Sequence, residues 1–171
     1  GGDTSTKTTT RSSSPVESAE ERQARLRSAH QRTVDTVEKN AQDLKRKEED
    51  LQYETDLARI NAMQDGFDKE QQLRTLNHQK VLRDLDRERD DMVAAIKAAA
   101  KAEWDARENE EKEKHKKYVP KAFDWDKNAT DEQRGQVASV IDLYGKRKAN
   151  QMAVNTAEDT AALNKALDQY K

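Results

Sequence analysis

The scarcity of helix-breaking residues sets the strongest constraint on the fold. Residues 16 to 119 contain no proline and a single glycine, Gly66. Proline and glycine are the residues that most disfavour a helix interior. Of the whole chain, 39% is charged and 33% is hydrophobic, too little apolar material for a globule with a deep core. The sequence therefore predicts an all-α fold of long charged helices, arranged as an elongated antiparallel coiled coil or helical hairpin.

Composition excludes several classes of function. The 32 basic and 34 acidic residues nearly cancel, so the chain has no electrostatic footprint for nucleic acid or an anionic membrane. It has no cysteine, which excludes disulfide bonds and thiol chemistry. No apolar run reaches about 18 residues, so we expect no membrane span in this segment. Because the chain begins at Gly1 without an initiator methionine, we expect it to be part of a longer protein.

Changes in composition divide the chain into four segments. A capping box of Ser14 and Glu17, with Pro15 at the first helical position, predicts where a long helix begins. Pro120 ends it, because the residue before a proline is pushed out of the helical conformation. The predicted segments are a flexible Ser/Thr-rich leader (1–14), a long helix (15–117), an aromatic loop (118–130) and an antiparallel return helix (131–171).

Apolar residues in the first part of the long helix recur at alternating steps of three and four. This spacing is that of the a and d positions of a coiled coil, and Glu48 and Thr55 interrupt it. We expect the part of this seam from Val34 to Leu51 to pair with another copy of the chain or with a partner helix. The residues of the whole seam are Val34, Val37, Ala41, Leu44, Leu51, Ala58 and Ala62.

The apolar register changes at Gly66, and two structures are compatible with the change. In the first, Gly66 ends a helix, Asp68 and Gln71 cap the next one, and the chain forms a hairpin. In the second, the helix continues through Gly66 at a cost of about 1 kcal/mol. The register shift favours the hairpin.

The aromatic loop and the return helix complete the predicted packing. Tyr118, Phe123 and Trp125 are expected to pack on the adjoining helices as a plug, and a platform for a ligand is the alternative. Thr130 and Gln133 form a capping box for the return helix, whose partner is the stripe from Phe67 to Trp104. The residues predicted to pack between helices are Leu44, Leu51, Phe67, Leu82, Leu85, Met92, Ile141 and Tyr144.

No motif for catalysis or ligand binding is present. His30, His78 and His115 are far apart in the chain and show no metal-binding spacing. Phosphate-binding loops and nucleophile elbows are absent from the sequence. The basic runs at 115–117 and 145–148 are flanked by acids, so nucleic-acid binding is only a minor hypothesis. We expect a protein that is not an enzyme, with no catalytic, cofactor-binding or metal-binding residues and no cofactor.

The residues around Gly66 resemble a segment of the tail tape-measure proteins of phages and prophage-like elements. The resemblance rests on the run RINAMQDGFDKE at 59–70, on the leucines that follow, on a loop containing Phe123 and on the ending Leu167 to Tyr170. It covers about residues 55–171. It implies a continuous helical rod, and on this ground we favour the continuous helix at Gly66.

The same resemblance implies a structural function. The chain would be an internal helical segment of a tape-measure protein, acting as a spacer or ruler in tail assembly. Its partners would be tail tube and tail assembly proteins, and its location the virion tail, assembled in the host cytoplasm. The alternative is a coiled-coil oligomerisation or adaptor module of a cellular protein, located in the cytoplasm.

Overall fold

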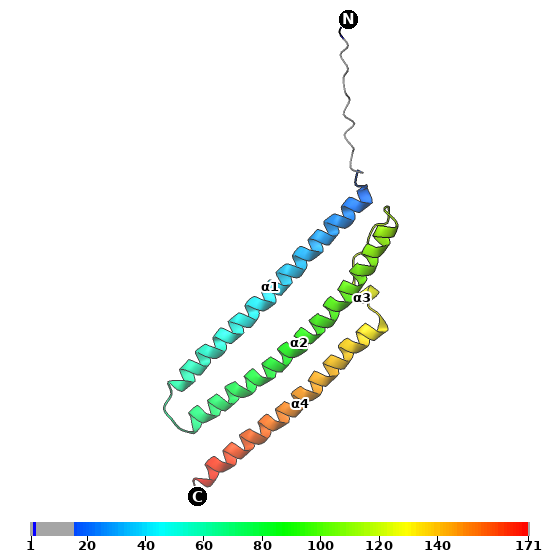
Figure 1. Ribbon diagram of the computed structural model, residues 1–171. Helices are drawn as coiled ribbons and strands as arrows, with labels where there is room; N and C mark the ends of the chain where they lie inside the picture. The colour runs from blue at the N-terminus through cyan, green and yellow to red at the C-terminus, as the bar shows by residue number, and fades with distance from the viewer. Residues whose placement is uncertain (1, 3–15, 171) are drawn as a thin grey trace.

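The fold is all-α, as the sequence predicts. The structure, a computed structural model, describes residue 2 and residues 16–170, and within these ranges it contains no strand. Three long helices and one short helix follow one another along the chain (Figure 1). They are α1 (Ala19–Asn61), α2 (Phe67–Lys114), α3 (Trp125–Asn128) and α4 (Asp131–Asp168).

The first helix begins later than its predicted start at residue 15. Residues 16–18 are not helical, and Ser18 is the N-cap, whose hydroxyl accepts a hydrogen bond from the backbone N–H of Glu21 at 3.1 Å. Ser18 is followed by acids in the first turn, which favour the positive end of the helix dipole. The predicted cap Ser14 and Pro15 lie outside the described residues.

Between α1 and α2 the chain turns at residues 62–66, so the continuous helix is wrong and the hairpin is the observed structure. Gly66 has φ 156° and ψ −173°, a backbone conformation that is essentially restricted to glycine. No atom lies within 4 Å of the place where a Cβ would stand on Gly66, so only the backbone requires glycine. The ammonium of Lys69 closes the turn by donating to the Asn61 carbonyl at 3.2 Å and to the Asp65 carboxylate at 2.9 Å.

The predicted caps differ in outcome. At α2 the capping box of Asp68 and Gln71 is wrong, because the N-cap is Gly66, which has no side chain to accept a hydrogen bond. At α4 the capping box is confirmed. The Thr130 hydroxyl accepts from the Gln133 N–H at 3.1 Å, and the Gln133 side chain accepts from the Thr130 N–H at 2.9 Å.

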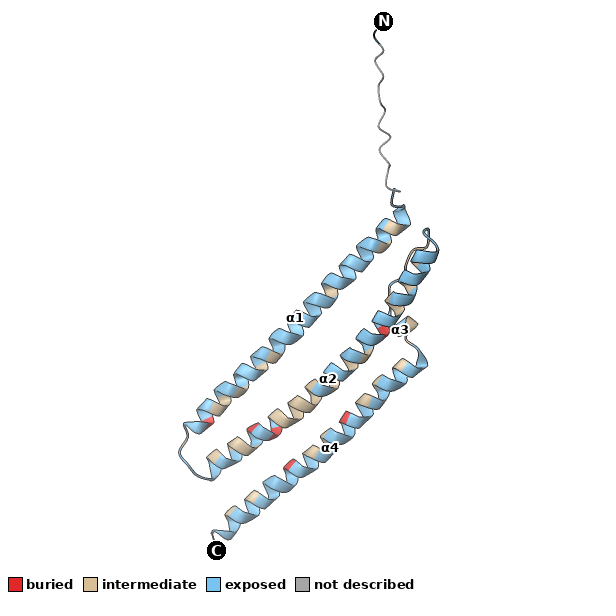
Figure 2. Cartoon of the chain, viewed as in Figure 1, coloured by how far each residue is buried: buried red, intermediate tan, exposed pale blue. Residues whose placement is uncertain are grey.

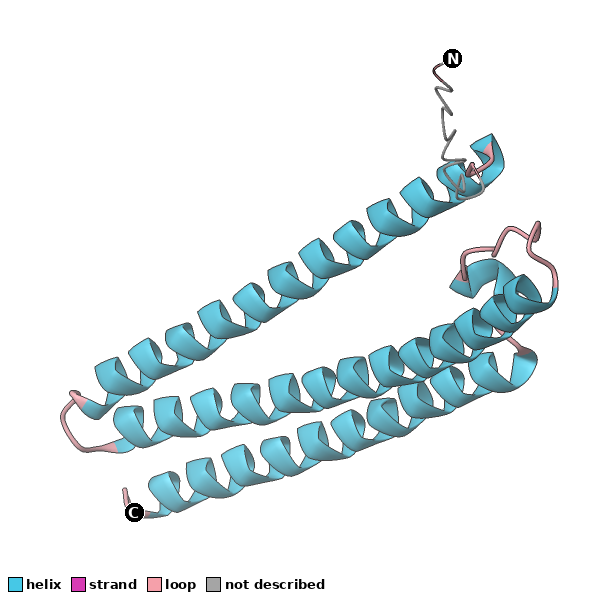
Figure 3. Cartoon of the chain, turned by 45° about the horizontal axis from the view of Figure 1, so that its top comes forward, coloured by secondary structure: helices cyan, strands magenta, loops and turns pink. Residues whose placement is uncertain are grey.

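The three long helices form a layer in which α2 lies between α1 and α4 (Figures 1 and 3). Arg83 and Arg87 of α2 contact α1, whereas Arg74 and His78 of α2 contact α4. Arg74 and Arg83 are nine residues apart, as are His78 and Arg87, and nine residues make two and a half helical turns. The two contacts therefore use opposite sides of α2.

Little of this layer is shielded from solvent (Figure 2). No large side chain among the described residues is completely buried. The buried residues in the described ranges are Ile60, Leu76, His78, Ala100, Tyr144 and Asn155. The fold therefore depends on contacts between pairs of helices rather than on one deep core.

Replacing Gly66 with alanine tests the turn. In the hairpin, Gly66→Ala forces a strained backbone and is expected to lower the free energy of unfolding by about 1–3 kcal/mol. In a continuous helix, the same substitution would raise it by about 1 kcal/mol, because alanine is the better helix former. Urea denaturation followed by circular dichroism measures the difference.

Gly145→Ala is the matched control, because Gly145 lies inside α4 and also has no atom within 4 Å of a Cβ position. It is expected to stabilise the protein by about 1 kcal/mol. A Gly66→Ala protein that gains stability as Gly145→Ala does would contradict the hairpin.

Candidate interaction surface

Charged side chains make the contact between α1 and α2. The Arg87 guanidinium of α2 donates to Asp50 at 2.8 Å and to Glu49 at 3.0 Å, both in α1. Arg83 forms an ion pair with Asp50 at 3.2 Å. Both arginines also donate to backbone carbonyls of α1. Arg87 donates to the Arg46 carbonyl at 3.1 Å, and Arg83 donates to the Glu49 carbonyl at 3.4 Å. These bonds fix the register of the hairpin.

The electrostatics of Arg87 show how this contact is balanced. Burial by itself would lower the pKa of the guanidinium, but the hydrogen bonds to Asp50 and Glu49 and the negative charges of these two carboxylates together outweigh burial and raise the pKa. The Nε atoms of Arg83 and Arg87 are buried and have no hydrogen-bond partner within the described ranges. Because the paired carboxylates remain partly exposed, each ion pair contributes at most about 1 kcal/mol.

The predicted apolar seam of α1 lies on the side away from α2. Val37, Leu44 and Leu51 are 61%, 59% and 63% exposed. Each is nine residues, or two and a half turns, before a residue that faces α2. The facing residues are Arg46, Tyr53 and Ile60. Arg46 forms an ion pair with Asp91 of α2, and the Tyr53 ring lies beneath the ammonium of Lys80 of α2. Ile60 is 2% exposed.

We call the exposed set Leu26, Val37, Leu44 and Leu51 the α1 stripe. Leu44 and Leu51 were predicted to pack between helices, and no helix of the described chain covers them. Their packing partner therefore stays a prediction. A row of exposed aliphatic side chains at coiled-coil spacing is an interaction surface in many helical proteins.

The contact between α2 and α4 combines apolar and polar groups. Tyr144 of α4 is buried, and its hydroxyl donates to Glu88 at 3.3 Å and lies 3.2 Å from the sulfur of Met92. Leu82 and Leu85 are half-buried on α2. The other predicted packing residues, Phe67, Met92 and Ile141, keep about half of their surface exposed.

Two buried polar residues in this contact, His78 and Asn155, are not among the residues predicted to pack between helices. The His78 ring lies 2.9 Å from the Glu158 carboxylate, and buried Asn155 accepts a hydrogen bond from Gln151 at 2.9 Å. A signal was present, because Tyr144, Lys148, Gln151 and Asn155 follow one another at steps of four, three and four. A pattern of apolar residues alone does not reveal polar residues that occupy buried positions at the same spacing.

The aromatic loop folds back on the end of α2. The ring centroids of Phe123 and Trp104 are 6.0 Å apart, and those of Phe123 and Trp125 are 6.4 Å apart. The Trp104 indole donates to the Lys121 carbonyl at 2.9 Å. All three rings are half-buried, so the loop is held by aromatic contacts and one indole hydrogen bond.

Glu108 of α2 provides a second anchor for the loop. Its carboxylate accepts hydrogen bonds from the Tyr118 hydroxyl and, at 3.0 Å, from the Lys121 N–H. The bond from Tyr118 to this carboxylate raises the pKa of the Tyr118 hydroxyl above its ordinary value of 10.0. Tyr118 is thus tied to α2 by its polar end.

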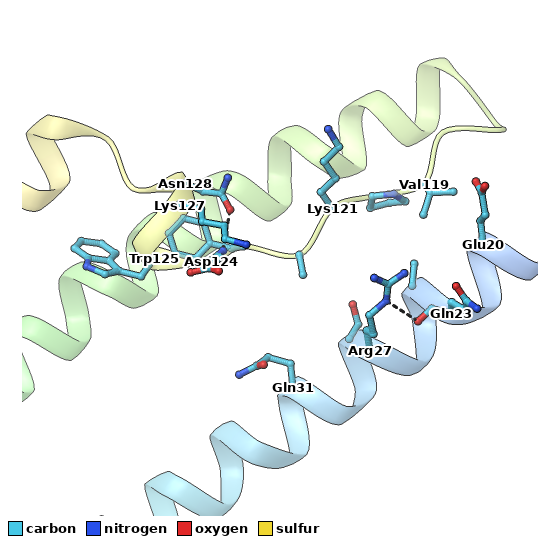
Figure 4. Close-up of a pocket in the computed structure, with 15 residues that line it drawn as sticks. Glu20, Gln23, Arg27, Gln31, Val119, Lys121, Asp124, Trp125, Lys127 and Asn128 are labelled. Carbon is cyan, nitrogen blue, oxygen red and sulfur yellow. Dashed lines mark hydrogen bonds between the residues drawn. The ribbon is translucent and has the colours of Figure 1, made fainter.

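An open cleft of about 1030 Å³ separates this loop from the first turns of α1 (Figure 4). Glu20, Gln23 and Arg27 line it from α1, and Lys121 and Trp125 line it from the loop. Arg27 donates within its own helix, to the Gln23 carbonyl at 3.4 Å. The lining side chains do not converge on one point, and the part of the chain that is described contains no metal-binding group of His, Asp and Glu.

Comparison with protein-family models, with curated proteins and with solved structures finds no match to this chain. None of the helices in the described ranges combines the length and the apolar character needed to cross a bilayer.

The anchor at Tyr118 predicts a pH dependence. Because the folded-state pKa of Tyr118 is raised, the hydrogen bond to Glu108 stabilises the fold fully below pH 10 and is lost as the pH rises through the raised value. Ultraviolet difference absorbance of tyrosinate should show Tyr118 ionising at a higher pH in the wild-type protein than in Glu108→Gln. The Tyr118→Phe variant shows which part of the tyrosinate absorbance comes from Tyr118. Equal ionisation in both proteins would contradict the contact.

Proposed function

We propose that this segment is a non-enzymatic structural module that works by packing its helices against other helices. The observation that carries this proposal is the exposed α1 stripe on the side of α1 opposite α2. An aliphatic row at heptad spacing that its own chain leaves exposed is typical of a surface that packs against another helix. The charged groups in the described helix contacts are engaged in holding helices together, as Arg87 and His78 are.

For the setting of this module, we propose a spacer segment in a phage tail tape-measure protein. The resemblance around Gly66 supports this setting and covers the part of the chain that forms α2, the loop and α4. A tape-measure segment contributes length. The hairpin has the length of one helix, because α1 with 43 residues spans about 65 Å and α2 with 48 residues about 72 Å.

The second candidate is a coiled-coil oligomerisation or adaptor module of a cellular protein. The observation that favours it is the position of the α1 stripe, which lies in residues 26–51 and therefore outside the region that resembles tape-measure proteins. In this case the module would join two protein chains and would not determine a length.

Tail length in the parent phage distinguishes the two settings. Deleting residues 16–170 from the parent protein is expected to shorten the tail by about 70 Å, which is the length of one long helix and therefore of the folded hairpin. Electron microscopy of assembled particles measures the change. A shortening of roughly 150 Å would mean that α1 and α2 act as one extended helix in the tail. An unchanged tail length would exclude the spacer.

The matched control replaces Leu44 and Leu51 with glutamine and keeps the chain length. If the segment acts as a spacer, this variant should leave the length of any assembled tail unchanged, because it removes apolar surface and no helical rise.

A further inference from the structure

We propose that the α1 stripe binds a second copy of this chain, with the two α1 helices antiparallel and a two-fold axis beside residues 42 and 43. This inference rests on the proposed function, since it names the partner of the packing module.

Three residues of the stripe, Val37, Leu44 and Leu51, belong to a short coiled-coil seam, and Leu26 lies outside it. Val37, Leu44 and Leu51 occupy one core position at intervals of seven residues, and Val34, Ala41 and Glu48 occupy the other. This face lies about half a turn away from the residues that contact α2, so a second helix can approach it without disturbing the hairpin. Residues 34–51 span about 27 Å, which limits the pairing to about two and a half heptads.

One antiparallel register pairs most of the apolar core residues and also the charges that flank them. When Val34 is placed opposite Leu51 of the second copy, Ala41 falls opposite Leu44 of the second copy. The same register places Glu48, which is exposed in the single chain, opposite Val37 of the second copy. The charged residues that flank the core then pair as well. Glu38 of each copy lies opposite Lys45 of the other, so the two-fold symmetry forms this pair twice.

Other arrangements of the same helices bring like charges together. A slip of one heptad in one direction places Glu38 opposite Glu38, and a slip in the other direction places Lys45 opposite Lys45. A parallel, in-register pair places the two Glu48 carboxylates opposite each other in the core. Like charges at these positions are destabilising, so the flanking charges favour the register that pairs Glu38 with Lys45.

Charge exchange tests the arrangement in the full chain by sedimentation equilibrium. Glu38→Lys alone places lysine opposite lysine, and Lys45→Glu alone places glutamate opposite glutamate. Each is expected to weaken the dimer about tenfold or more, because each creates two repulsive pairs. The double variant E38K/K45E restores opposite charges and is expected to recover the wild-type dissociation constant.

Two further variants serve as controls. Asp43→Lys changes the net charge as Glu38→Lys does, at an exposed position off the seam, and should leave the dissociation constant within about twofold. The pair L44Q/L51Q removes the apolar contact and should leave the chain monomeric. Circular dichroism verifies that each variant keeps its helices.

Three results would overturn the inference. They are a wild-type chain that stays monomeric up to about 100 μM, a dimer that L44Q/L51Q does not weaken, and single charge variants that E38K/K45E does not rescue. The last two would assign any dimer to another face or to a parallel pairing. Each of these results leaves the tail-length measurement unaffected, so failure of this inference and failure of the spacer proposal are distinguishable.

Discussion

Arg83 and Arg87 hold α1 against α2 through bonds to Glu49, to Asp50 and to backbone carbonyls. The other features of the layer depend on this contact. It uses one side of α1 and one side of α2, so α4 packs on the opposite side of α2. Because this contact uses the polar side of α1, the aliphatic side of α1, which includes Leu44, has no packing partner in the described chain.

The features that could be predicted from the sequence are mainly local. Long helices follow from the scarcity of proline and glycine, and the α4 cap follows from a hydroxyl and an amide at the right spacing, Thr130 and Gln133. The turn at Gly66 was less predictable. One glycine costs a helix about 1 kcal/mol, a small amount for a long helix, so its identity alone does not separate a turn from a continuous helix.

The candidate surface illustrates a different limit. Heptad spacing identified Leu44 and Leu51 as packing residues, but spacing does not specify which helix covers them. The contact with α2 is formed instead by long arginine side chains, which a count of apolar residues overlooks. His78 and Asn155 were missed for the same reason, since polar residues occupy the buried positions of the contact with α4. A helical layer held by charged contacts therefore resembles a solvated surface in its sequence.

Because α1 folds back on α2, residues that are far apart in the chain lie close together, and a distance between the two helices is the sharpest test of the hairpin. The chain has no cysteine, so Asn40→Cys and Asp90→Cys would provide the only two sites for spin labels. Pulsed electron paramagnetic resonance, with the labelled protein diluted in unlabelled chain, measures the distance within one molecule. The hairpin predicts a separation of about 20 Å or less, because packed helix axes lie about 10 Å apart. A separation near 75 Å, the length of 50 helical residues, would contradict it.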